Sequence, residues 1–296
     1  MSVLKSHGRY DYLPIKGRPL YDWPNGKRLA VYVALNVEVF PFGEGMGPDL
    51  NLRQPEPDIP NYTWRDWGNR VGIWRLLDLF DEFAMPLTVN LNSAIYDECP
   101  QIAQALRTRG AEIVGHGRTN AERQAEMDEA TERGMIGEVT ARIEHEEGKP
   151  PAGWMGPWVN ETRVTPDLLR EAGYNYVMDW AMDEQPVWLK TRAGPLLAVP
   201  CARPTNDITA LHGAKVAPAL WGDMLIDQFD EMLRQSEQEP LVFNLSLHPF
   251  LVGHAFRLKH LRRAVMHIAA RRERVWMARA GDIASHVMSL PAGTLG

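Results

Sequence analysis

The apolar run Leu29–Val37 constrains the fold of this chain more than any other feature. All of its residues except Asn36 are apolar, which predicts a strand buried on both faces. Strands of this kind are typical of parallel sheets covered by helices. Similar runs at Leu87–Leu91, Ala111–Val114 and Leu241–Leu247 alternate with segments of helical periodicity. The alternation predicts an α/β fold whose parallel sheet is rolled into a barrel.

The remaining elements are predicted from periodicity and from turn residues. Helices are expected at Val71–Phe80, Cys99–Arg107, about Ala121 to Glu147, Pro166–Ala172, Leu225–Ser236 and Leu258–Arg271, and strands near Trp154 and at Tyr176–Asp179, Leu196–Val199 and Val275–Met277. Thr119 and Glu122 fit a capping box at the start of the long helix. The Pro/Gly-rich stretch 41–60 predicts a loop, and a loop of this length is more often functional than inert. We expect it to cover a pocket.

Composition narrows the class of protein. The chain has 296 residues and a net charge of -6, which disfavours a nucleic-acid partner. The arginines of 262–274 fit the solvated face of an amphipathic helix. Two distant cysteines and the lack of an apolar stretch of about 18 residues predict a cytoplasmic protein without a disulfide framework or a membrane span. We expect one domain over 25–296, with an N-terminal extension over 1–24 that packs on the barrel.

Polar residues follow the predicted strands, and active residues of barrels lie at these carboxyl ends. They are Asn36, Glu38, Asn90, Asn92, His116, the segment Trp154–Trp158, Asp179, the segment Arg203–Asp207, and His248.

Three of these residues carry the strongest chemical signal. His116 stands between two glycines at a strand end, a poor position for core packing, and His248 ends a buried strand. Glu38 follows a buried strand among aromatic residues, and burial would raise its pKa into the range of a general base. A solvent-facing loop carboxylate is the alternative for Glu38, and a core histidine bonded to backbone is the alternative for His248.

Several motifs together resemble a known family. They are the segment Trp67–Leu106, the His116 loop, Gly153–Trp158, Asp179-Trp180 and Leu245–Pro249. In their order the chain resembles the polysaccharide deacetylase superfamily, the NodB-homology amidohydrolases, over roughly residues 25 to 290. Gly253–Arg257 and Val275–Ile283 are similar to the branch of allantoinases and cyclic-imide hydrolases. The resemblance implies a distorted (β/α) barrel of about seven strands and hydrolysis of non-peptide C–N bonds.

The family's metal ligands are a carboxylate and two histidines four residues apart. Glu38, His116 and Asn120 stand at the corresponding positions. An amide oxygen is a poor ligand for zinc, so Asn120 weakens the metal site. The sequence leaves open whether zinc is bound, and hence whether Glu38 is a ligand or the base.

A second departure concerns a charged pair of the family. Its aspartate base and the arginine that pairs with it correspond here to Asn36 and Met155, both neutral. Losing both together avoids leaving one buried charge unpaired. By resemblance, His248 is the general acid that protonates the leaving nitrogen, and Asp179 orients it. The alternative for Asp179 is a structural role, as a cap or in an ion pair.

Other residues are candidates for substrate binding. Trp154 and Trp158 are expected as pocket walls, and Gly153 and Gly156 suit a close backbone approach at which an amide stabilises an oxyanion. The remaining candidates are polar and lie in loops: Asn36, Arg65, Arg70, Arg203, Asn206, Asp207, His254 and Arg257. His254 and Arg257 are open to a second role at a subunit interface.

These observations predict an amidohydrolase that opens a small cyclic ureide or imide. The alternatives are a deacetylase of N-acetyl sugars and a catalytically inactive barrel that binds a ligand. The resemblance also implies a homo-oligomer such as a tetramer. A small molecule is the expected partner, with neither nucleic acid nor membrane.

Overall fold

A single curled sheet forms the centre of the computed structural model, which describes residues 5–44, 55 and 57–295. The strand order is β6-β7-β5-β4-β3-β2-β1-β8, and β9 also pairs with β1. The strands are β1 (Leu29–Val37), β2 (Leu87–Leu91), β3 (Glu112–Gly115), β4 (Gly153–Trp154), β5 (Tyr176–Val177), β6 (Val187–Leu189), β7 (Leu196–Ala198), β8 (Leu241–Leu247) and β9 (Trp276–Met277). Of these strands, as far as the chain is described, only β6 and β7 pair antiparallel. The predicted α/β class and the distorted barrel are confirmed.

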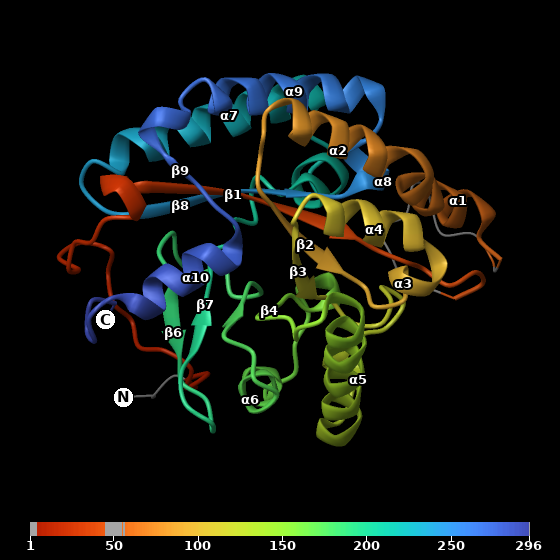
Figure 1. The fold of residues 1–296 in the computed structure, drawn as a ribbon, viewed down its shortest axis with the longest axis horizontal. Coiled ribbons are helices and arrows are strands. Elements are labelled where there is room, and N and C mark those ends of the chain that lie inside the picture. The colour runs from red at the N-terminus through yellow and green to blue at the C-terminus, as the bar shows by residue number, and fades with distance from the viewer. Residues whose placement is uncertain (1–4, 45–54, 56, 296) are drawn as a thin grey trace.

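Helices surround the sheet, most of them on its outer face, while α10 packs in the apolar cluster that contains Tyr32 (Figure 1). They are α1 (Ile59–Trp67), α2 (Ile73–Glu82), α3 (Ile95–Glu98), α4 (Pro100–Thr108), α5 (Glu129–Glu147), α6 (Thr165–Glu171), α7 (Pro218–Gln235), α8 (Pro249–Val252), α9 (Ala255–Ala269) and α10 (Ala280–Ser289). Figure 1 shows α7 and α9 side by side above β1 and β8, with α2 and α8 at the right. The parallel strands all point their carboxyl ends toward one edge, which is where a barrel gathers its functional side chains.

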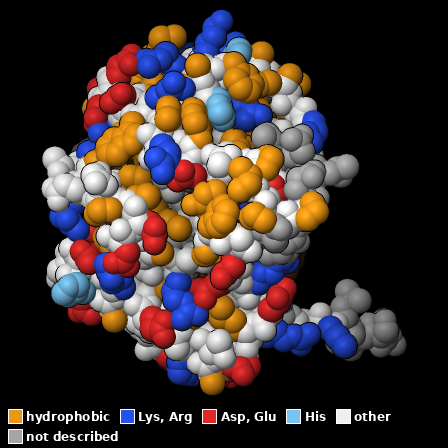
Figure 2. All heavy atoms as spheres, turned by 90° about the vertical axis from the view of Figure 1, so that its right-hand side faces the viewer, with side chains coloured by type: hydrophobic (Ala, Val, Ile, Leu, Met, Phe, Trp, Pro, Cys, Tyr) orange, Lys and Arg blue, Asp and Glu red, His pale blue; other side chains and the backbone are white. Residues whose placement is uncertain are grey.

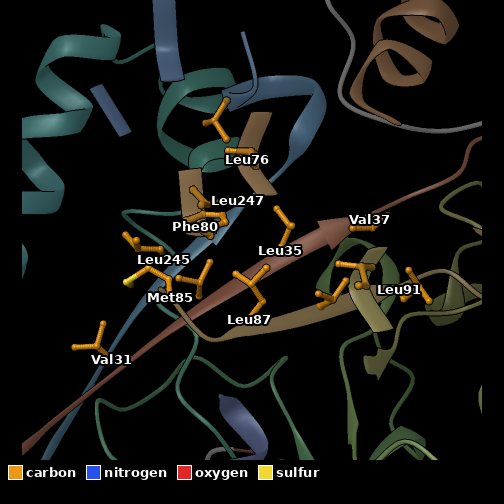
Figure 3. Packing of buried hydrophobic residues seen from close by; sticks show 14 of the residues in the cluster. Val31, Leu35, Val37, Leu76, Phe80, Met85, Leu87, Leu91, Leu245 and Leu247 are labelled. Atoms are coloured by element: carbon orange, nitrogen blue, oxygen red, sulfur yellow. The ribbon is translucent and has the colours of Figure 1, made fainter. Parts of the chain in front are cut away.

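Both faces of β1 are buried, which explains its continuous apolar sequence. Val31 and Leu35 belong to the core cluster that also contains Phe80 of α2 and Leu247 of β8, and Leu35 lies beside these two residues (Figure 3). Tyr32, on the opposite face, belongs to a second apolar cluster inside the curl of the sheet. Each fully buried aliphatic or aromatic side chain contributes about 1.5–3 kcal/mol to the stability of the fold.

The long helix starts later than predicted. Asp128 caps α5 by accepting a hydrogen bond from the backbone N–H of Thr131 at 2.8 Å. Thr119 accepts only from the N–H of Ala121, and Glu122 pairs with Arg118, so the predicted capping box is wrong. Asp128 followed by Thr131 provides the real cap, because an aspartate side chain satisfies a free amide of the first turn.

Residues 45–54 and 56, which belong to the predicted loop 41–60, lie outside the described residues. The stretch ends in α1, which begins at Ile59.

At the N-terminal end, Arg9 forms an ion pair with Asp167 of α6 at 2.6 Å. None of the described helices is both long and apolar enough to cross a bilayer.

Candidate active site

A pocket of about 140 Å³ lies at the carboxyl ends of the strands and gathers most of the predicted site residues. It is lined by Asn36, Glu38, His116, Asn120, Met155, Trp158, Val159, Arg203, Asn206, Ile208, Thr209, His248 and Phe250. Figure 2 views the molecule from the side toward which β1 runs, and acidic and basic side chains are interspersed there with apolar ones. The prediction that these strand ends meet at one place is confirmed.

His248 is held by a buried carboxylate. Its Nδ1 lies 2.7 Å from Oδ1 of Asp207, and its backbone N–H donates to Oδ2 of the same residue at 2.7 Å. Burial alone would lower the pKa of His248, but the charge of Asp207, the charge of Glu38 and the hydrogen bond that the ring donates to Asp207 together raise it above its ordinary value. The imidazole is therefore favoured in its protonated form, with Nε2 directed toward Glu38.

The predicted orienting residue, Asp179, is wrong for this role. Both of its carboxyl oxygens accept from the backbone N–H of Gly156 at 3.0 Å, so Asp179 fixes the loop after β4. Burial raises the pKa of Asp179 to about 6, and a hydrogen bond links it to Glu161. The sequence signal for Asp207 was its place in the polar segment after β7, which was assigned only to substrate binding.

Glu38 lies between the two histidines. Its Oε1 is 3.5 Å from Nε2 of His116 and 3.6 Å from Nε2 of His248. Burial raises the pKa of Glu38, but the charge of His248, the neighbouring ring of His116 and a hydrogen bond from Asn120 outweigh it. The pKa is thus lowered, and the predicted increase is wrong because the neighbours favour the carboxylate more than burial opposes it.

The backbone orients His116. Its Nδ1 lies 2.5 Å from the carbonyl oxygen of Met155, so Nδ1 carries the proton and Nε2 presents its lone pair to the pocket. Nε2 is buried and meets no closer partner than Glu38 among the described residues. Gly117 makes this turn possible, because its φ is +67° and a Cβ would strike the ring of Pro157. His116 can therefore accept a proton inside the pocket.

Asn120 turns its amide nitrogen, and not its oxygen, toward the site. Asn92 accepts from the N–H of Val39 through Oδ1 and donates through Nδ2 to the carbonyl of His116 and to Oδ1 of Asn120. These backbone contacts fix Asn92, which in turn fixes Asn120. The nitrogen of Asn120 is then the atom that is left to hydrogen-bond Glu38.

The predicted zinc ligands do not fit zinc. Glu38 and His116 could supply two ligands, but Asn120 offers an N–H donor in the third position. A metal ion needs lone pairs from its ligands, and zinc prefers imidazole, thiolate or carboxylate. Within the described ranges, no group of three His, Cys, Asp or Glu side chains has a spacing that could hold a metal. Asn120 as a ligand is the part of the prediction that fails.

The neutral pair Asn36 and Met155 is brought together through a third residue. Asn90 donates from Nδ2 to Oδ1 of Asn36 at 2.8 Å and contacts Sδ of Met155 at 3.0 Å. Asn36 donates in turn to the carbonyl of Leu247 at 3.0 Å. Two positions that carry opposite charges in the family thus touch the same neutral amide here, as the sequence suggested.

Only one of the two predicted tryptophan walls lines the pocket. Trp158 lies in the wall, with its indole N–H bonded to the carbonyl of Asn120 at 3.0 Å. Trp158 and Val159 have φ values of +69° and +55°, which are strained for these side chains. Trp154 is fully buried against Tyr174 in the core, so its predicted pocket role is wrong. Trp154 is the last residue of β4, and its side chain is part of the hydrophobic core.

The predicted oxyanion donor is also absent from the pocket. The N–H of Gly156 is occupied by Asp179, and a Cβ at Gly156 would strike the carbonyl of Asn160. Gly153 lets the ring of Tyr176 pack directly on the backbone of β4. Both glycines permit close approach, as predicted, but the group that approaches is protein and not substrate.

The polar loop residues divide into two groups. Arg203 and Asn206 line the pocket, whereas Arg65 lies over the ring of Phe40, in the wall of a neighbouring cavity of about 610 Å³ that also touches Glu38. His254 stacks on Trp67 at 3.8 Å outside the pocket lining, so its predicted substrate contact is not supported. His254 is the N-cap of α9, and its ring stacks on the last residue of α1.

Comparisons with known proteins agree with this geometry. No protein-family model matches the chain. A Schizosaccharomyces pombe protein provisionally named a polysaccharide deacetylase is 23% identical over 297 residues, which span 88% of this chain and 91% of the relative. The crystal structure of a probable polysaccharide deacetylase of Pseudomonas aeruginosa PAO1 superposes with a TM-score of 0.79 at 27% identity, over 89% of this chain and 92% of the other.

An allantoinase is similar to the same extent. The crystal structure of Puue allantoinase superposes with a TM-score of 0.80 at 28% identity, over 94% of this chain and 97% of the other. The predicted resemblance is confirmed: the chain is related in sequence and in fold to the polysaccharide deacetylase superfamily, and an allantoinase is among its close structural neighbours.

Proposed function

We propose that this protein hydrolyses a non-peptide C–N bond and that it opens the ring of a small cyclic ureide or imide. The observation that carries the proposal is the arrangement of two imidazole nitrogens around one carboxylate oxygen. Nε2 of His116 and Nε2 of His248 both lie within 3.6 Å of Oε1 of Glu38. General acid–base hydrolysis needs one group that accepts a proton and another that donates one, and these residues supply both.

His116 and Glu38 form the basic side of the site. The lone pair of His116 Nε2 and the ionised carboxylate of Glu38 face the same space. A water molecule there donates its protons to these two acceptors, and its oxygen is free to attack a carbonyl carbon of the ring. The proton that the water loses is taken by one of these two acceptors.

His248 forms the acidic side. Attack converts the ring carbonyl into a tetrahedral carbon, and the C–N bond must then break with protonation of the nitrogen. Protonated His248 donates from Nε2, while Asp207 stabilises the imidazolium through Nδ1. The opened ring keeps the former carbonyl as a carboxylic acid, and His248 regains its proton as the base pair returns to its starting state.

Pocket size favours a ring over a sugar chain. The pocket measures about 140 Å³, and a protein cavity of about 150 Å³ takes up a single benzene molecule. A five- or six-membered ring therefore fits, and the neighbours named as polysaccharide deacetylases support only the wider class of reaction. The similarity to an allantoinase supports ring opening.

The proposal is tested by assaying the purified protein on two sets of substrates. Hydantoin, allantoin and succinimide report ring opening, and N-acetylglucosamine oligomers report deacetylation. Ring opening that is lost in His248→Ala is the expected result. Activity on the oligomers alone would establish the second candidate, a deacetylase, which the names of the relatives favour. Activity on neither set would support a barrel that only binds a ligand.

A homo-oligomer and a cytoplasmic location stay predictions from the sequence. Light scattering on the purified protein measures the first.

A further inference from the structure

The pocket offers a substrate very few free hydrogen-bonding groups. Asn36 uses its amide nitrogen on Leu247 and its amide oxygen on Asn90. Asn206 uses the corresponding atoms on the hydroxyl of Ser246 and on the N–H of Ile208. Asn120, described above, is engaged on both sides as well. Protein partners therefore hold the amides of the pocket in place on both sides.

Besides the acid–base residues, two polar side chains of the lining are not held by such hydrogen bonds. They are the guanidinium of Arg203 and the hydroxyl of Thr209. For neither side chain does the described part of the chain provide a hydrogen-bond or ion-pair partner. This is unusual for the arginines of this protein, since Arg9, Arg18 and Arg118 are all paired with carboxylates.

Arg203 is nevertheless held close to the reacting groups. Its loop is fixed to the barrel because Tyr32 donates to the carbonyl of Pro200 at 2.6 Å and the N–H of Ala202 donates to Asn244 at 2.7 Å. The side chain is exposed at the pocket edge. Its positive charge reaches both His248 and Asp179, where it partly offsets the increase in each pKa. A positive charge without a protein partner thus stands at the edge of a pocket the size of one ring.

We propose that Arg203 is a specificity-determining residue, which selects cyclic ureides or imides that carry an acidic substituent. The proposal rests on the ring-opening function proposed above and goes beyond it by naming the substituent. The ring occupies the pocket beside Glu38 and His248, and the substituent extends to the edge, where the guanidinium pairs with its carboxylate. Arginine suits this task because its planar fork matches two carboxylate oxygens, and Thr209 can donate a further hydrogen bond.

Two ligands of the same shape test the charge. Hydantoin-5-acetate and hydantoin-5-acetamide differ in the charge of the substituent and hardly in its size. We expect the protein to open the acetate with a kcat/KM roughly 10- to 100-fold higher than the acetamide, the usual contribution of a hydrogen bond between charged groups. Arg203→Gln should remove this preference, chiefly through KM, and Arg203→Lys should keep part of it.

A matched control and the opposing results complete the experiment. Arg234→Gln removes the same charge from the exposed ion pair with Glu231 on α7 and should leave the ratio of the two kcat/KM values unchanged. Equal rates for both ligands in the unmodified protein would overturn the inference. So would an equal loss for both ligands in Arg203→Gln, which would assign the arginine to the ring itself. Failure to open either ring, or hydantoin, would instead refute the proposed function.

Discussion

Asp207→Asn tests the assignment of the general acid. In the structure Asp207 is fully buried, and its two oxygens accept from the ring and from the backbone N–H of His248 at 2.7 Å each. The variant keeps the shape of the side chain but removes the negative charge and one of the two acceptors. The loss of a charge-assisted hydrogen bond destabilises the protonated imidazole, relative to the neutral one, by about 1.5–3 kcal/mol.

This energy converts directly into a pKa. One pKa unit corresponds to about 1.4 kcal/mol, so the pKa of His248 should fall by roughly one to two units. Because the acid must be protonated to act, the activity falls as the pH rises through this pKa. The alkaline limb of kcat/KM should therefore move to lower pH by the same one to two units. The alkaline limb of kcat/KM reports the pKa of the acid in the free enzyme, and it is measured from pH–rate profiles of ring opening.

Asp179→Asn is the matched control, because the family resemblance assigned the orienting role to that residue. It removes another carboxylate near the site, but one that binds the N–H of Gly156 and not His248. We expect its alkaline limb to stay in place, whatever happens to the maximal rate. A limb that moves in Asp179→Asn and stays in Asp207→Asn would refute the assignment. Thermal melting of both variants confirms that the compared proteins are folded.

Three further predictions follow from the site and the core. Glu38→Gln and His116→Gln should each lower kcat by about 100- to 10,000-fold, and near-normal kcat in both would contradict the proposed basic side. Asn120→His should raise the zinc content measured by elemental analysis, since it replaces an N–H donor by an imidazole lone pair; unchanged content would show that the geometry excludes the metal. Gly153→Ala should lower the free energy of unfolding, measured by chemical denaturation, by at least about 1–3 kcal/mol, because the added Cβ would overlap the ring of Tyr176 in β5. Gly134→Ala in α5 has open space around it and should raise that free energy by about 0.5–1 kcal/mol.

The fold and the location of the site could be predicted from the sequence because both depend on local patterns. An apolar run fixes a strand such as β1, and parallel strands bring Glu38, His116 and His248 to one edge whatever the details of the loops. The location of the site was therefore predicted correctly, although the Thr119 motif led to a wrong prediction for the start of α5.

The partners of these residues could not be predicted, because they are set by contacts between distant loops. Asp207 reaches His248 across 41 residues, and nothing in the spacing distinguishes it from Asp179. The pKa of Glu38 was misjudged for the same reason. Burial was visible in the sequence, whereas the two histidines and the amide that outweigh it meet only in three dimensions.

The central place of β1 has a consequence for synthesis of the chain. Leu29 of β1 pairs with Leu241 of β8, so one of its neighbours in the sheet lies more than 200 residues downstream. At a translation rate of about 5–20 residues per second, β8 is synthesised roughly 10–40 seconds after β1. During this time an apolar strand has one unpaired edge, which favours aggregation and engagement by chaperones. A chain truncated before β8 should therefore be captured or degraded, and should not accumulate as a smaller barrel.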